Sequence, residues 1–153
     1  MFIIRKFQKG DELYLREIFF NTIRNVNIKD YSPLQVQAWA PENYDISIWY
    51  ERIKAIEPFI AVLDGEIVGY ADIQSDSYID HFFCHWKHQG KGVGKKLMQK
   101  IIAVGQQKGI ERFYAHVSIT AKPFFEHFGF LMVNPQQVEV RGQILINYVM
   151  EKR

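Results

Sequence analysis

Hydrophobic and polar residues follow two periods along the chain, one typical of strands and one typical of helices. Residues 2–7 predict a first strand. After Gly10 and Asp11 the apolar positions take the spacing of a helix that ends near Val26. Further helices are predicted near 33–39, 46–56, 93–104 and 121–128, and further strands near 58–63, 66–73, 78–85, 112–119, 130–140 and 143–150.

Two tight turns show how some of these strands pair. Asp64-Gly65 and Arg141-Gly142 each join two apolar runs, and such pairs suit the positive φ values of a two-residue hairpin. Antiparallel hairpins interleaved with helices predict a mixed sheet of the α/β (α+β) class. The chain has no internal repeat, low-complexity run or linker, so residues 1–153 are expected to form a single domain.

Composition narrows the class of protein. Hydrophobic residues make up 48% of the 153 positions, enough for a sizeable core, which excludes a disordered chain. The formal charge of +2 is too small for a protein that depends on nucleic acid. Cys84 is the single cysteine, which excludes an internal disulfide, and no apolar run is long enough to span a bilayer. We therefore expect a cytoplasmic protein without a membrane partner.

A cluster of glycines lies where the strand near 78–85 gives way to the helix that follows. A helix N-terminus carries free N–H groups and partial positive charge, and glycines allow a phosphate to approach the backbone. A P-loop is excluded because Gln89 and Lys96 occupy two of its required positions. A GxGxxG dinucleotide motif counted from Gly90 is excluded because Lys95 occupies its last position.

The spacing Gln89-x-x-Gly92-x-Gly94 resembles the acetyl-CoA motif of GCN5-related N-acetyltransferases (GNAT). The resemblance extends to "EPFIAVLDGEIVGYADI", "YIDHFFCHWKHQGKGVGKKLMQKII" and "SITAKPFFEHFGF", in the order and spacing of that family. It implies the GNAT fold, a mixed, mostly antiparallel sheet of six to seven strands flanked by about four helices. It also implies that residues 1–153 form one N-acetyltransferase domain.

The resemblance further implies a site for coenzyme A as co-substrate. The main chain of Phe83 and Cys84 is expected to pair with the pantetheine arm, and Ser118 to hydrogen-bond it. Backbone N–H groups are expected to hold the pyrophosphate; these belong to Gln89, Gly90, Lys91, Gly92, Val93, Gly94 and Lys95. The alternative is that the glycines form only a tight turn between strand and helix.

Acetyl transfer to an amine requires a base, because an alkylamine with a pKa near ~10.4 is protonated at neutral pH. The positions that correspond to the family's usual bases are Asp80 and Tyr78, with Asp80 as base and Tyr78 holding a water. A solvated or salt-bridged carboxylate is the alternative for Asp80. The backbone N–H of Cys84 is expected to bind the oxyanion. His81 and His85 would reach the site only through a strand bulge, and with Cys84 they do not form a regular metal site, so no metal is expected.

The chain departs from the family pattern at the position of the general acid. The family often has a tyrosine four residues before the closing glycine, and here that residue is Phe125, which cannot donate a proton. Tyr148, Tyr114 and Tyr78 are possible replacements. Phe125 also keeps open an alternative function, a non-catalytic acyl-CoA-binding sensor or regulatory module.

The acceptor is expected to bind under the segment 27–45, where the resemblance places the acceptor pocket. Tyr31 and Trp39 lie in this segment and, with Tyr78, are expected to bind the acceptor, since aromatic rings suit a small amine or an aromatic acceptor. The alternative is that the rings of this segment only anchor a loop that lacks a core of its own. The sequence thus predicts direct attack by the primary amine of a small molecule or peptide on acetyl-CoA in a ternary complex. Homodimers are common in the family, and the sequence leaves the oligomeric state open.

Overall fold

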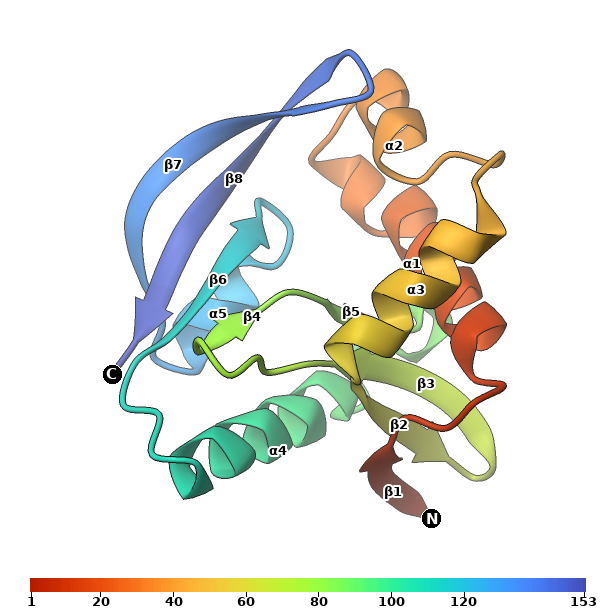
Figure 1. Cartoon of the computed structure of the whole chain (residues 1–153). Helices are drawn as coiled ribbons and strands as arrows, with labels where there is room; N and C mark the ends of the chain where they lie inside the picture. Colours follow the sequence, from red (N-terminus) through yellow and green to blue (C-terminus); the bar gives the residue numbers. More distant parts are fainter.

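Eight strands form two four-stranded sheets that diverge from each other in the computed structural model, which describes residues 1–153 (Figure 1). The first sheet is antiparallel and has the order β1 (Phe2–Lys6), β2 (Phe59–Leu63), β3 (Glu66–Ala71), β5 (Phe82–Cys84). The second has the order β4 (Tyr78–Ile79), β6 (Phe113–Ser118), β8 (Gln143–Lys152), β7 (Leu131–Val140). Within it, β4 and β6 are parallel and the other pairs antiparallel.

The helices cover both faces of the first sheet. One apolar cluster joins β2 and β3 to α1 (Glu12–Asn25), α2 (Pro33–Trp39) and α3 (Ile46–Ile56). A second cluster joins the other face to α4 (Val93–Gln107) and α5 (Lys122–His127). Alternation along β2 divides the two clusters, since Ile60 belongs to the first and Ala61 to the second. Short 3₁₀ turns, η1 (Asn27–Lys29) and η2 (Trp86–His88), follow α1 and β5.

Most of the predicted elements are confirmed, and the α+β class with them. The hairpin turns at Asp64-Gly65 and Arg141-Gly142 have positive φ at all four residues, as the two-residue loops require. The helix that follows the glycines is longer than expected, because it continues through Gly105 to Gln107. Gly105 lies inside α4 instead of ending it. Glycine is needed at this position because a Cβ would lie 2.4 Å from the ring of Phe113.

The prediction of one strand over 78–85 is wrong, because Asp80 and His81 separate β4 from β5 and the two strands join different sheets. The side chain of Asp72, which follows β3, stabilises this break between the strands. Its Oδ1 accepts hydrogen bonds from the backbone N–H of Asp80 at 3.0 Å and of His81 at 2.6 Å. Backbone donors that leave a ladder need another partner when they are buried. The Asp72 carboxylate supplies it, and the two sheets therefore diverge at this point.

Hydrogen bonds join the segment between α1 and α3 to the second sheet. The Tyr31 hydroxyl donates to the carbonyl of Ile146 at 2.7 Å and accepts from the backbone N–H of Ile119 at 3.0 Å. Ser32 and Gln35 form a capping box that begins α2. The first two helices thus meet the end of β6 and the middle of β8 across the space between the sheets. No helix is long and apolar enough to cross a membrane.

Candidate active site

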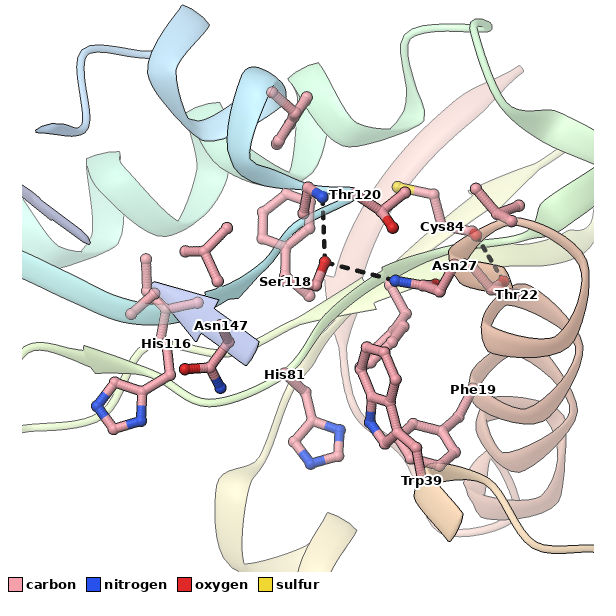
Figure 2. A pocket seen from close by; sticks show the side chains of 18 of the residues that line it. Phe19, Thr22, Asn27, Trp39, His81, Cys84, His116, Ser118, Thr120 and Asn147 are labelled. Carbon is pink, nitrogen blue, oxygen red and sulfur yellow. Dashed lines mark hydrogen bonds between the residues drawn. The ribbon is translucent and has the colours of Figure 1, made fainter. Parts of the chain in front are cut away.

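A cavity of about 1060 Å³ lies where the two sheets diverge. Its walls come from α1, α3, the break between β4 and β5, the start of α4, the end of β6 and the β8 strand. Figure 2 shows side chains from α1, α2, the break between β4 and β5, β6 and β8 facing one another across it. The cavity therefore joins the glycine segment to the segment 27–45, which the sequence assigned to different functions.

The glycine segment presents free backbone donors to this cavity. Gly92, with φ of 83°, is the N-cap of α4, and the first bond within the helix runs from the N–H of Lys96 to the carbonyl of Gly92. The N–H groups before it have no partner within the helix. A Cβ built on Gly90 or Gly92 would meet no heavy atom within 4 Å, so the backbone there faces open space. This arrangement suits a phosphate.

Two residues of the glycine segment make contacts within the protein instead of offering a free backbone group. A Cβ at Gly94 would lie 2.9 Å from the ring of Phe124, so glycine is needed there to pack α5 against α4. Lys91 does not line the cavity, and its ammonium lies 3.4 Å from Nδ1 of His88. Of the predicted phosphate-binding segment, Gln89, Gly90, Gly92, Val93, Gly94 and Lys95 do line the cavity.

The edge of β5 offers main-chain groups to the cavity. Bonds from His85 to Val68 and from Asp72 to His81 set the ladder between β3 and β5. Because hydrogen-bonded and non-hydrogen-bonded pairs alternate in such a ladder, Phe83 bonds to β3 and the N–H and C=O of Cys84 point away from it. The main-chain groups of Phe83 are thus engaged with β3, and its ring lines the cavity.

The Cys84 carbonyl is already occupied. It accepts from Thr22 Oγ1 at 2.8 Å (Figure 2) and from Gln89 Nε2 at 2.9 Å. These bonds connect α1 and the glycine segment to β5. Cys84 is half-buried, and this burial raises the pKa of its thiol to about 12. The sulfur is therefore protonated at neutral pH and is no nucleophile. The amide N–H is the group of Cys84 that remains for a ligand.

His81 reaches the cavity through the strand break. Its Nδ1 lies 3.0 Å from the hydroxyl of Tyr70, and both side chains are buried. Burial raises the pKa of Tyr70, so the phenol keeps its proton, and His81 Nδ1 is its one hydrogen-bond partner. The proton of neutral His81 then resides on Nε2. Burial lowers the pKa of His81 to about 3, which makes this side chain a neutral donor and a poor base.

Tyr78 and Asp80 both border the cavity, as expected for residues that act together. The Tyr78 ring packs on Tyr114 and His116, and burial raises the pKa of its phenol to about 12. Asp80 is exposed, and its carboxylate makes no hydrogen bond or ion pair within the protein. An unengaged carboxylate at the rim is free to hold a water or a substrate amine.

At the opposite wall, Ser118 ends β6. Its Oγ accepts from the N–H of Ala121 at 3.0 Å and from Asn27 Nδ2 at 3.4 Å (Figure 2). Phe125 is buried and packs edge-on against Phe82 and Phe130, so the position that often carries an acid is part of the core here.

Of the three tyrosines expected as replacements for that acid, only Tyr78 lines the cavity. Tyr148 lies outside the cavity beneath the ammonium of Lys122, and the hydroxyl of Tyr114 lies 3.4 Å from Asp76. The catalytic role of Tyr148 stays a prediction, and Tyr78 is the replacement that the cavity favours.

Three comparisons with known proteins agree on the family of this chain. Residues 27–152 match the model of the acetyltransferase (GNAT) domain. N-acetyltransferase YafP of Escherichia coli (strain K12) is 34% identical over 147 residues, which cover 96% of this chain and 93% of that protein. The chain belongs to the GNAT family. The resemblance in the sequence is thereby confirmed, and the protein is an N-acetyltransferase by family.

Solved structures show the same fold. A GCN5-related N-acetyltransferase from Rhodopseudomonas palustris has a TM-score of 0.94 at 27% identity, covering 98% of this chain and 94% of that one. Salmonella typhimurium yncA, solved with its cofactor acetyl-CoA, has a TM-score of 0.71 at 20% identity, covering 100% of this chain and 94% of that one. The GNAT fold predicted from the sequence is confirmed, with its strands divided between two sheets.

Several residues of this GNAT cavity were missed by sequence reasoning. Thr22 falls at the spacing of the apolar positions in the helix predicted to end near Val26, and Asn27, His116 and Asn147 carry no distinguishing pattern. Arg16 was missed as well, although it is buried and lines the cavity. The chain contains no group of three or more His, Cys, Asp or Glu residues placed to hold a metal ion.

Proposed function

We propose that this GNAT protein transfers the acetyl group of acetyl-CoA to the primary amine of a small molecule or peptide by direct attack in a ternary complex. One observation carries the proposal. The open backbone of Gly90 and Gly92 and the outward amide of Cys84 border the same cavity. The first suits a pyrophosphate and the second a thioester carbonyl, the two groups that coenzyme A joins through its pantetheine arm.

The acetyl-CoA site fits the residues present. The N-terminus of α4 lacks acidic residues in its first turn, and Lys95 adds a positive charge beside it. Ser118 offers a hydroxyl on the wall opposite β5. Bound there, acetyl-CoA supplies an activated carbonyl carbon and a thiolate leaving group.

In the proposed reaction the amine nitrogen attacks the acetyl carbonyl carbon. The oxyanion formed accepts a hydrogen bond from the Cys84 N–H, the C–S bond then breaks, and the electron pair leaves on sulfur. The proton lost by the amine passes to Asp80, directly or through a water. The Tyr78 phenol, protonated at neutral pH, can return a proton to the thiolate.

The reaction can proceed slowly without a dedicated general acid, for two reasons. A thiolate with a pKa near ~8.5 leaves without full protonation, and a general acid contributes at most ~10²–10⁴-fold. The absence of a hydroxyl at Phe125 therefore reduces the rate without abolishing the reaction. The same residue favours the second candidate, a protein that binds acyl-CoA as a sensor and performs no transfer.

Substitution Asp80→Asn separates the two candidates. An enzyme that uses this base loses about 10²-fold or more in kcat while its acetyl-CoA affinity stays within about twofold of the original. Glu111→Gln, at an exposed acid outside the cavity, is the matched control and leaves both unchanged. Equal turnover in Asp80→Asn and Glu111→Gln contradicts the role of Asp80. Acetyl-CoA binding without turnover on any amine favours the sensor.

A further inference from the structure

The arginines that line the cavity have no acidic partner. Elsewhere in the chain Arg5, Arg24 and Arg112 pair with carboxylates. The three that line the cavity form no ion pair at all; these are Arg16, Arg52 and Arg141. The acids in the same lining are Asp45, which caps α3, and Asp80, proposed above as the base. The acceptor side of the cavity therefore holds an excess of positive charge.

Arg16 is the most unusual of the three, because its side chain is only 8% exposed. Its Nη2 donates to the carbonyl of Pro41 at 2.8 Å. Its Nε is buried without any hydrogen-bond partner, and its Nη1 makes no hydrogen bond within the protein. A buried guanidinium nitrogen without a partner is costly, and Nη1, which is not buried, is the nitrogen that a ligand in the cavity can reach. Burial lowers the pKa of Arg16, and the nearby charge of Arg141 lowers it further.

Aromatic rings position this guanidinium relative to the reaction centre. It lies 3.8 Å from the ring centre of Tyr44 and 5.2 Å from those of Phe19 and Trp49. The same two rings, Phe19 and Trp49, contact His81, with ring centres 6.0 and 6.1 Å from it. Arg16 and His81 are thus separated by about one aromatic side chain. His81 adjoins the proposed base Asp80 in the chain, so Phe19 and Trp49 lie between the guanidinium and the strand break that carries the base.

We propose that the acceptor is a small amine that also carries a carboxylate, held about one aromatic ring away from the amine. The carboxylate accepts hydrogen bonds from Arg16, with Arg52 and Arg141 adding attraction. The apolar body of the acceptor lies along Phe19 and Trp49, and its amine faces Asp80. This substrate class rests on the proposed acetyl transfer, and the guanidinium, whose planar donors match a carboxylate, decides the choice of anion.

The first test compares two amines that differ only in charge. 4-(Aminomethyl)benzoate has the amine and the carboxylate on opposite sides of one ring, and 4-(aminomethyl)benzamide lacks the charge. Thiol release from acetyl-CoA is expected to give a kcat/KM at least about tenfold higher for the acid, since a hydrogen bond to a charged group is worth that much or more. In Arg16→Gln the preference falls to about twofold or less, through KM, while Arg16→Lys recovers part of it.

Controls separate charge recognition from damage to the fold. Arg112→Gln removes an arginine outside the cavity and should keep the preference for the acid. If Arg16→Gln does not fold, Arg52→Gln carries the test, because Arg52 is exposed on α3 and makes no hydrogen bond to the protein. It should lower the preference about threefold or more by loss of one screened charge. Equal use of acid and amide by the unaltered protein, or an unchanged preference in both variants, overturns the inference.

A binding measurement distinguishes failure of this inference from failure of the proposed function. 4-Methylbenzoate has the carboxylate and the ring but no amine, so it binds without reacting. In the presence of coenzyme A, 4-methylbenzoate is expected to bind the unaltered protein. The unaltered protein should bind 4-methylbenzamide at least about tenfold more weakly, and the Arg16→Gln variant should bind 4-methylbenzoate at least about tenfold more weakly. Absence of 4-methylbenzoate binding overturns the carboxylate site, while acetylation of neutral amines would still support the transferase. If acetyl-CoA itself does not bind, the proposed function fails.

Discussion

Gly92 and Gly109 allow the phosphate site to be tested with a closely matched pair of substitutions. Both glycines flank α4, their φ angles are 83° and 81°, and a Cβ on either would meet no heavy atom within 4 Å. Only Gly92 lines the cavity. Gly92→Ala and Gly109→Ala therefore impose the same backbone strain, and only the first places a methyl group where a phosphate is expected.

The magnitudes follow from these angles. A non-glycine residue in the left-handed region costs ~1–2 kcal/mol, so both variants should lose that much stability, or about 3–6 °C in Tm for a chain of this size. The two losses should agree within about 0.5 kcal/mol. Gly92→Ala should also weaken acetyl-CoA binding at least about tenfold, or ~1.4 kcal/mol, while Gly109→Ala leaves the Kd unchanged.

Calorimetric titration with acetyl-CoA measures the affinity, and thermal unfolding monitored by circular dichroism measures the stability. Gly92→Glu extends the test, because it adds a negative charge at the same point and should abolish binding. Equal acetyl-CoA affinity in Gly92→Ala and Gly109→Ala would refute the phosphate site and leave the glycines as a turn between strand and helix.

Two further predictions concern the fold around the cavity. Burial raises the pKa of Asp72 to about 6, so between about pH 4 and 6 the folded chain holds a proton that the unfolded chain releases. The free energy of unfolding of the unaltered protein, relative to that of Asp72→Asn, should thus fall by about 3 kcal/mol as the pH rises through that window. Urea unfolding of both proteins at each pH measures this difference, and a constant difference would contradict the raised pKa. Gly105→Ala places a methyl group 2.4 Å from the buried ring of Phe113 and should cost ~1–3 kcal/mol; unchanged unfolding would show that the ring moves freely.

Sequence periodicity predicted what is determined locally. The two hairpins depend on turn residues that adjoin their strands, and α3 begins after Asp45, which caps it with its own side chain. The glycine segment could likewise be assigned from its spacing and its place before a helix. The fold class was therefore accessible from the sequence, and so was the glycine segment as a proposed coenzyme site.

Long-range contacts explain what could not be predicted. The break between β4 and β5 depends on the carboxylate of Asp72, which reaches it from the end of another strand. Thr22 has the spacing of an apolar helix position, although its hydroxyl binds the carbonyl of Cys84, 62 residues away. In the sequence Arg16 has the pattern of a solvated helix residue, but in the structure it is buried beside Tyr44 and Trp49. None of these roles has a local signal.

The central claim is that this cavity transfers an acetyl group to an amine, and mass spectrometry of the acceptor tests it most directly. The protein is incubated with acetyl-CoA carrying a ¹³C-labelled acetyl group and with 4-(aminomethyl)benzoate and 4-(aminomethyl)benzamide. We expect a labelled N-acetyl product on at least one of the two amines, with equal amounts of free coenzyme A and a strong decrease in Asp80→Asn. Tight binding of acetyl-CoA with no labelled product on either amine or on a wider panel of primary amines would contradict the claim.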